Sequence, residues 1–201
     1  MNDRPPHTGL AAGLHHSLLL QAGRVFRCGV RNGKVVPGAG DVTPTFEPVA
    51  GLPDVEFVSV ACGYHHSLAL TVDGALWVFG TSQFGQLGLG AAGTEEVPPT
   101  VASFSRPVQS IAAGAFHSLV VDEAGVLWAF GLGKQHQLGV GRRTRDNPTP
   151  RQTDLEGAIR AAWGGDAHSV ALTPTGELFS FGRGRTGCLG SRGDRPKPKP
   201  V

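Results

Sequence analysis

The sequence predicts an all-β fold in which about four β-propeller blades of short antiparallel strands follow one another along 201 residues. Gly-x-x-His-Ser occurs four times, at 13–17, 63–67, 114–118 and 165–169. A glycine also recurs at an unbroken spacing of 51 residues, at Gly29, Gly80, Gly131 and Gly182. Between these markers the chain has tight turns and almost no helical periodicity. A repeat of this length is typical of one supersecondary unit used several times.

The second repeat shows the expected strands most clearly. Residues 58–61 lead into Gly63, residues 66–70 alternate apolar with small or polar side chains, and residues 75–79 are rich in large apolar types. Asp73-Gly74 lies between the last two runs and predicts a tight hairpin turn. The repeat therefore begins as strand, strand, turn and strand.

A loop and an outer strand complete the predicted unit. The glycines between Gly80 and Gly90 suit a loop with positive-φ positions. Pro98-Pro-Thr-Val101 predicts a short outer strand, because proline is tolerated at sheet edges but not inside a ladder. A sheet of this size cannot bury both faces alone, and packing such sheets radially yields a propeller.

Aromatic residues precede the recurring glycine in three of the units. The pairs are Trp77 with Phe79, Trp128 with Phe130, and Phe179 with Phe181. Each pair lies on one side of its strand, because side chains two residues apart point the same way. We expect these rings to form the core between blades.

One stretch carries a resemblance to a known family. Residues 62–90, CGYHHSLALTVDGALWVFGTSQFGQLGLG, resemble the regulator of chromosome condensation repeat almost end to end, and the similarity extends over nearly the whole chain. It implies a propeller that has seven blades in the best-known members. We divide this chain into repeats 1–46, 47–97, 98–148 and 149–201 of a single repeat domain.

Four repeats are fewer than seven blades require. The sequence leaves open a fragment, an alternative product, an open arc that is a partial propeller, and a four-bladed ring. An open arc would expose apolar blade faces at both ends, and this predicts self-association through them.

The repeated polar residues are predicted to be structural. They are Gly63, His66, Ser67, Gly80, Gly114, His117, Ser118, Gly131, Gly165, His168, Ser169 and Gly182. A metal site needs ligands that converge from chosen positions, whereas a residue present in every unit serves the unit. We expect each His-Ser pair to hydrogen-bond turn backbone within its own blade. His15 and His65 are expected at the surface.

The sequence indicates no enzyme active site and no cofactor. It lacks the phosphate-binding loop, His-Glu-x-x-His, Cys-x-x-Cys and Gly-x-Ser-x-Gly. Gly-x-Gly-x-x-Gly matches at 88–93 and 182–187, but neither leads from a strand into a helix, as a dinucleotide site requires. Both matches are interpreted as repeat loops.

Net charge and composition limit the classes of partner and the location that we expect for the protein. A net charge of +2 makes nucleic acid unlikely as a partner, and no apolar run approaches the length of a membrane span. Cytosol or nucleus is the expected location, with three free cysteine thiols. Two groups of arginines are predicted to contact a protein partner: Arg142, Arg143 and Arg145, and Arg183 with Arg185. The basic tail that follows is expected to be an extended segment or a frayed end.

The function predicted from these features is a non-enzymatic protein–protein interaction module. The resemblance implies an alternative, a guanine-nucleotide exchange factor for a Ran-like small GTPase, or a fragment of one. The sequence shows no insertion long enough for the β-wedge used by exchange factors of this kind. A plant-type ultraviolet-B photoreceptor is disfavoured, because Trp77, Trp128 and Trp163 are only three tryptophans.

Overall fold

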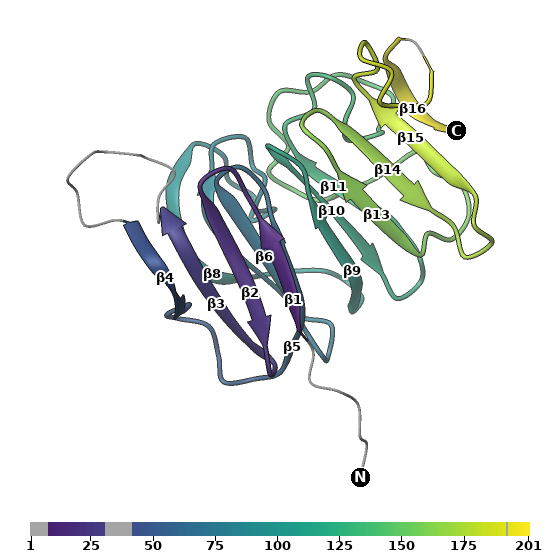
Figure 1. The fold of residues 1–201 in the computed structure, drawn as a ribbon. Coiled ribbons are helices and arrows are strands. Elements are labelled where there is room, and N and C mark those ends of the chain that lie inside the picture. Colours follow the sequence, from purple (N-terminus) through teal and green to yellow (C-terminus); the bar gives the residue numbers. More distant parts are fainter. Residues whose placement is uncertain (1–7, 31–41, 192) are drawn as a thin grey trace.

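The computed structural model describes residues 8–30, 42–191 and 193–201, and this part of the chain is all-β (Figure 1). Its strands form four antiparallel sheets of four strands each, and in every sheet the strand order follows the chain. The sheets succeed one another from the purple end to the yellow end of Figure 1. The prediction of propeller blades is confirmed. None of the described residues forms a helix that could span a membrane.

The first two blades carry the elements expected from the second repeat. Blade 1 consists of β1 (Gly9–Ala12), β2 (His16–Gln21), β3 (Arg24–Val30) and β4 (Val42–Pro48). Blade 2 consists of β5 (Phe57–Cys62), β6 (His66–Thr71), β7 (Leu76–Ser82) and β8 (Thr94–Ala102). The outer strand β8 is longer than predicted and contains residues 97 and 98, which the predicted repeats place in different units.

The last two blades repeat this order. Blade 3 consists of β9 (Val108–Ala113), β10 (His117–Asp122), β11 (Leu127–Gly131) and β12 (Arg151–Gln152). Blade 4 consists of β13 (Ala161–Gly164), β14 (His168–Leu172), β15 (Leu178–Gly182) and β16 (Arg195–Pro200). The prolines of the basic tail therefore belong to an edge strand paired with β15, and this segment is not a frayed end.

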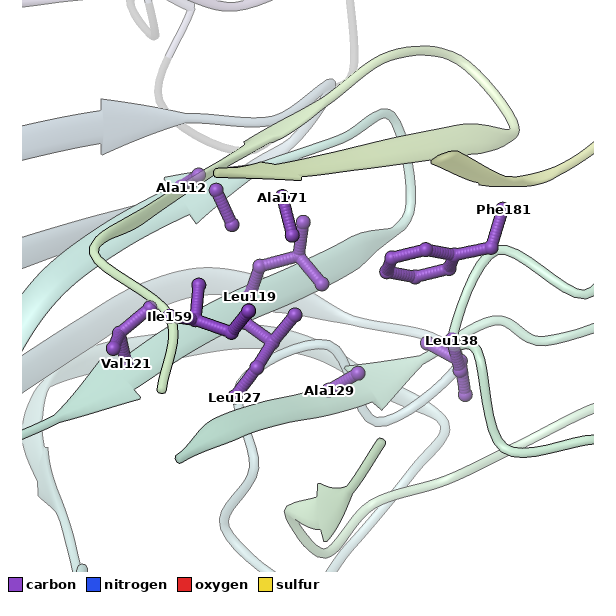
Figure 2. Close-up of a cluster of buried hydrophobic side chains, with 10 residues drawn as sticks. Ala112, Leu119, Val121, Leu127, Ala129, Leu138, Ile159, Ala171 and Phe181 are labelled. Atoms are coloured by element: carbon purple, nitrogen blue, oxygen red, sulfur yellow. The ribbon is translucent and has the colours of Figure 1, made fainter. Parts of the chain in front are cut away.

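The hydrophobic core lies between neighbouring sheets. Figure 2 shows Phe181 of blade 4 pointing toward Leu119 and Leu138 of blade 3, and all three side chains are buried. Phe79 packs in the same way on blade 1, and Phe130 on blade 2. Burying one such ring contributes about 3 kcal/mol. The predicted aromatic core between blades is confirmed.

Candidate functional site

The repeated motif and the variable loops lie at the same end of each blade. The motif histidine that begins the second strand pairs with the glycine near the end of the third, as in His66 with Gly80 and His117 with Gly131. The turn before the second strand and the loop after the third strand are therefore neighbours. We call this side of the molecule the loop face; it consists of the motif turns and the loops 83–93, 132–150 and 183–194, of which residue 192 is outside the described residues.

The motif histidines of blades 1, 2 and 3 each bond to the motif serine of the next blade. His16 Nε2 lies 2.8 Å from Ser67 Oγ, and His66 Nε2 lies 3.0 Å from Ser118 Oγ. His117 Nε2 lies 2.9 Å from Ser169 Oγ. The expectation that each pair bonds within its own blade is therefore wrong, and the pairs connect neighbouring blades instead.

A second hydrogen bond gives this contact a direction. Ser118 Oγ donates to the carbonyl oxygen of Gln86 at 2.7 Å, and Ser169 Oγ donates to that of Gln137 at the same distance. Because the hydroxyl proton is used there, the histidine must donate through its Nε2–H. Nδ1 of His66 has no hydrogen-bond partner among the described residues, and the same holds for His117. We call the repeated contact the His–Ser ladder.

Burial keeps the ladder histidines neutral. Loss of hydration lowers the pKa of His66 and of His117 to about 3, with neighbouring histidines adding to the effect. The pKa of His16 falls to about 4 for the same main reason, and Arg27 lowers it further. A neutral imidazole with its Nε2–H committed to a serine is a structural hydrogen-bond donor.

The motif glycine makes room for this arrangement. A Cβ at Gly63 would collide with the imidazole of His66 and would lie 2.6 Å from the carbonyl oxygen of Gly114. A Cβ at Gly114 would meet His117 and the Gly165 carbonyl in the same way. Glycine therefore allows the histidine ring to lie against its own turn and the inner strands of successive blades to approach closely.

The pair of residues between the motif glycine and histidine is different in every blade, although its second residue is histidine in blades 1 and 2. The pairs are Leu14-His15, Tyr64-His65, Ala115-Phe116 and Asp166-Ala167. The first residue of each pair lines a groove of about 260 Å³ at the ends of the inner strands β1, β5, β9 and β13. The motif glycines and small residues such as Ala113 form the rest of its wall. We call it the axial groove.

Aromatic side chains gather beside the axial groove. The rings of His15 and His65 stack with centroids 5.7 Å apart. Tyr64 and Phe84 each meet Phe116 edge to face, at 5.1 and 5.4 Å. These five residues form the ring cluster. His15 is exposed as expected, whereas His65 is partly buried, and burial together with His15 lowers the pKa of His65.

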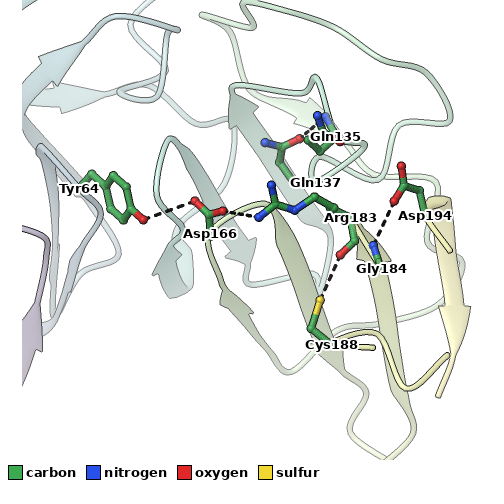
Figure 3. A network of polar contacts seen from close by, with 8 residues as sticks. All are labelled: Tyr64, Gln135, Gln137, Asp166, Arg183, Gly184, Cys188 and Asp194. Atoms are coloured by element: carbon green, nitrogen blue, oxygen red, sulfur yellow. Dashed lines mark hydrogen bonds and ion pairs between the residues drawn. The ribbon is translucent and has the colours of Figure 1, made fainter. Parts of the chain in front are cut away.

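Charged residues of blade 4 connect directly to this cluster (Figure 3). Arg183 Nη2 lies 2.6 Å from Asp166 Oδ2, and the Tyr64 hydroxyl donates to Asp166 Oδ1 at 3.5 Å. Tyr64 belongs to blade 2 and Asp166 to blade 4, so the contact passes over blade 3. The structure thus links Arg183, predicted from the sequence, through Asp166 to Tyr64, which the sequence reasoning missed.

The other predicted arginines lie in the loops of blades 3 and 4. Arg143 is 3.5 Å from Asp194 and donates to His136 Nε2 at 3.0 Å, and Arg145 is 3.9 Å from Asp146. Arg142 and Arg185 are exposed. The arginines therefore share the loop face, and acidic neighbours offset part of their charge.

Other chemistry is sparse in the described residues. They contain no cluster of three or more histidine, cysteine, aspartate or glutamate side chains that could hold a metal ion. Cys28, Cys62 and Cys188 are free thiols. Burial raises the pKa of Cys62 to about 12, which keeps this thiol protonated and unreactive.

Two family models match the chain. One describes the regulator of chromosome condensation (RCC1) repeat and matches residues 73–121 and 124–172. The other describes the same repeat and matches residues 57–86 and 108–137. The chain belongs to the RCC1 repeat family. The resemblance inferred from residues 62–90 is therefore confirmed.

Curated relatives are much longer than this chain. The human probable E3 ubiquitin-protein ligase HERC4 is 34% identical over 145 residues, which is 71% of this chain and 14% of the ligase. The Arabidopsis thaliana ultraviolet-B receptor UVR8 is 32% identical over 161 residues, which is 76% of this chain and 36% of the receptor. This RCC1 repeat chain thus spans only a minor part of either relative. Its Trp77 and Trp128 pack against blade cores, and Trp163 is 52% exposed.

Solved structures give the same picture at the level of the fold. Human WBSCR16 superposes with a TM-score of 0.83 at 27% identity, over 99% of this chain and 53% of that one. Prp20p of Saccharomyces cerevisiae gives a TM-score of 0.84 at 27% identity, over 98% of this chain and 51% of that one. The four blades described here correspond to about half of each of those chains.

Proposed function

We propose that this chain is a non-enzymatic protein–protein interaction module that contacts its partner through the loop face. One observation carries the proposal. Within a single five-residue turn, the glycine, histidine and serine recur in every blade, while the residue after the glycine is different in each blade and lines the axial groove. Such variation on a constant scaffold is where partner choice usually resides.

Two solved structures of one relative, yeast Prp20, support a protein partner. Prp20p was characterised for its binding to Gsp1p and to histones. Yeast RCC1 (Prp20), at 28% identity, was crystallised bound to Kap60. This chain spans about half of that protein, so those partners are not assigned to it, and a protein partner is proposed only in general terms. Cytosol or nucleus is the location we propose.

The test is capture of a partner with matched variants. The double variant Tyr64→Ala/Arg183→Glu changes the loop face, whereas Arg24→Glu changes an exposed arginine at the opposite end of blade 1. We expect the proteins recovered with the unaltered chain to be lost with the double variant and retained with Arg24→Glu. Retention with the double variant and loss with Arg24→Glu would contradict the proposal.

The arc of blades also suggests self-association. Leu10 of blade 1 is 74% exposed and Leu178 of blade 4 is 41% exposed, so apolar side chains are accessible at both ends. We propose that these ends mediate contact between copies. A native mass of 20.9 kDa for the 201-residue chain, with no binding of a hydrophobic dye, would exclude it.

The similarity to Prp20p favours one second candidate, guanine-nucleotide exchange on a Ran-like small GTPase. Exchange would come from binding the nucleotide-free GTPase and would require no catalytic side chain. Release of labelled GDP from such a GTPase, with catalytic amounts of this chain, decides between the two. We expect no acceleration, and a clear acceleration would replace the pure interaction module with an exchange factor.

A further inference from the structure

The loop face is graded from apolar to basic, and this grading indicates what it binds. On the basis of the proposed function, we propose that the partner presents an acidic extended segment with one apolar anchor side chain. The anchor enters the axial groove beside the ring cluster, and the acidic residues extend over the loops of blades 3 and 4.

The anchor site is apolar and has an aromatic border. Leu14, which is 48% exposed, and Tyr64 line the axial groove, while glycines and alanines leave its wall free of bulky side chains. Tyr64 also contacts Phe116, which joins the groove to the ring cluster. A concave, largely apolar site bordered by aromatic rings is the usual anatomy of an interface hot spot.

The charge lies to one side of this anchor site. The loop of blade 2, residues 83–93, contains no charged residue. The described loop and motif-turn residues of blades 3 and 4 contain six cationic side chains and three carboxylates: Lys134, Arg142, Arg143, Arg145, Arg183 and Arg185, with Asp146, Asp166 and Asp194. Asp166, the one charged residue that lines the groove, is paired with Arg183. An excess of positive charge beside this groove is complementary to an apolar residue followed by acidic ones.

Arg183 lies where these two regions meet. Its ion pair with Asp166 is accessible, with side chains 42% and 51% exposed. A carboxylate of the partner could accept from the outward edge of this guanidinium, since arginine presents several donors in a fixed fork. The same position also links to the groove, through the hydrogen bond from Tyr64 to Asp166.

A protein segment fits this surface better than a nucleic acid. A phosphate backbone is neutralised by cations that are free to pair with it, whereas here Arg143, Arg145 and Arg183 each have an aspartate partner. The apolar groove beside Leu14 would in addition be left empty by a phosphate backbone. An acidic peptide with one anchor uses both features.

Fluorescence anisotropy with defined peptides tests the proposal. The probe is a labelled twelve-residue peptide of aspartate, glutamate and serine around one phenylalanine. Comparison peptides replace the phenylalanine with alanine, or every acidic residue with lysine, and a single-stranded DNA of similar length serves as a polyanion. We expect binding of the acidic phenylalanine peptide, about tenfold weaker binding when either feature is removed, and weakening with added salt.

Matched variants place the binding site. Tyr64→Ala and Arg183→Glu/Arg185→Glu should each weaken the acidic peptide about tenfold. Val72→Ala and Arg24→Glu, at exposed positions beyond the opposite ends of the strands, should change the affinity for the acidic peptide less than about twofold. Unfolding curves confirm that each variant is folded.

Three outcomes would overturn the inference. If the lysine peptide binds as tightly as the acidic one, charge does not select the partner. If DNA binds as tightly as the acidic peptide and the phenylalanine has no effect, the site is a general polyanion surface. Absence of peptide binding, when captured proteins still depend on Tyr64 and Arg183, rejects the acidic segment but leaves the interaction module standing. Captured proteins that ignore both residues reject the proposed function itself.

Discussion

Two sets of residues in the same turn behave in opposite ways. The motif glycine, histidine and serine of blades 2 and 3 are buried, and the histidine and serine bond across blade junctions. The residues between glycine and histidine change from blade to blade, and apart from Ala115 and Ala167 their side chains are partly or fully exposed. His117, for example, is fully buried, while its neighbour Phe116 belongs to the ring cluster. Adjacent positions in one turn can thus serve stability and recognition separately, because strand geometry sends them in different directions.

Acidification is the strongest way to test the buried set. The folded-state pKa values of His66 and His117, about 3, lie below the ordinary value of 6.5. Below pH 6.5 these histidines therefore bind protons in the unfolded chain but not in the folded one. Their contribution to the free energy of unfolding is complete above that pH and is lost as the pH falls toward about 3. We expect each histidine to remove about 2 kcal/mol of unfolding free energy between pH 6.5 and pH 5, measured by urea titration at several pH values. A flat profile over this window would contradict the neutral ladder.

Removal of one ladder histidine should have the next largest effect. His117→Ala deletes a fully buried ring and leaves Ser169 without its donor, which should cost about 3 kcal/mol of unfolding free energy. His15, the exposed residue before the motif histidine of blade 1, is the control. His15→Ala should change the free energy of unfolding by less than about 0.5 kcal/mol. Denaturant unfolding at pH 7 measures both variants. Similar losses of unfolding free energy would show that the buried and exposed positions do not differ in their contribution to stability.

Substitution of the motif glycine tests the close approach of inner strands. Gly63→Ala places a methyl group against the His66 ring and the Gly114 carbonyl and should cost about 2 kcal/mol. Gly9→Ala is the matched control, because its Cβ would lie 3.9 Å from Leu20 Cβ, an ordinary contact. If the two variants unfold at the same denaturant concentration, the motif glycine has no steric role.

The serine hydroxyl should show the smallest effect. Ser118→Ala removes the acceptor of His66 and the donor to Gln86 while it keeps the shape of the side chain, and it should cost about 1 kcal/mol. Ser17→Ala is the control, because no earlier blade of the described residues supplies a histidine to Ser17. Its free energy of unfolding should change by less than about 0.5 kcal/mol. Thermal unfolding of the two variants measures the difference. Equal shifts would show that the cross-blade bond adds nothing.

The sequence predicts the blades well because strand signals are local. The paired rings before the recurring glycine, such as Trp128 and Phe130, identified the core between sheets, and Asp73-Gly74 identified a hairpin. The direction of the His–Ser contact was predicted wrongly, although a signal was present. Adjacent residues of a strand point to opposite faces, so His66 and Ser67 had to face different blades.

The loop face was less accessible to sequence reasoning. Tyr64, Phe84 and Phe116 are far apart in the chain, and only the packing of blades brings their rings together. Their signal was variation inside an otherwise constant motif. The edge strand β16 was mistaken for a tail because its prolines suggested extension without pairing, whereas Arg195 fixes it through hydrogen bonds to Ser180 and Ser191.

The direction of the His–Ser ladder also determines how such an array can grow. The junction of blades 2 and 3 and that of blades 3 and 4 each take the donor from the earlier blade and the acceptor from the later one, and the serine proton returns to a loop of the earlier blade. A whole unit can therefore be duplicated or removed, and the two cut surfaces still match each other. This one repeated hydrogen bond is therefore compatible with an array that becomes longer or shorter by whole blades.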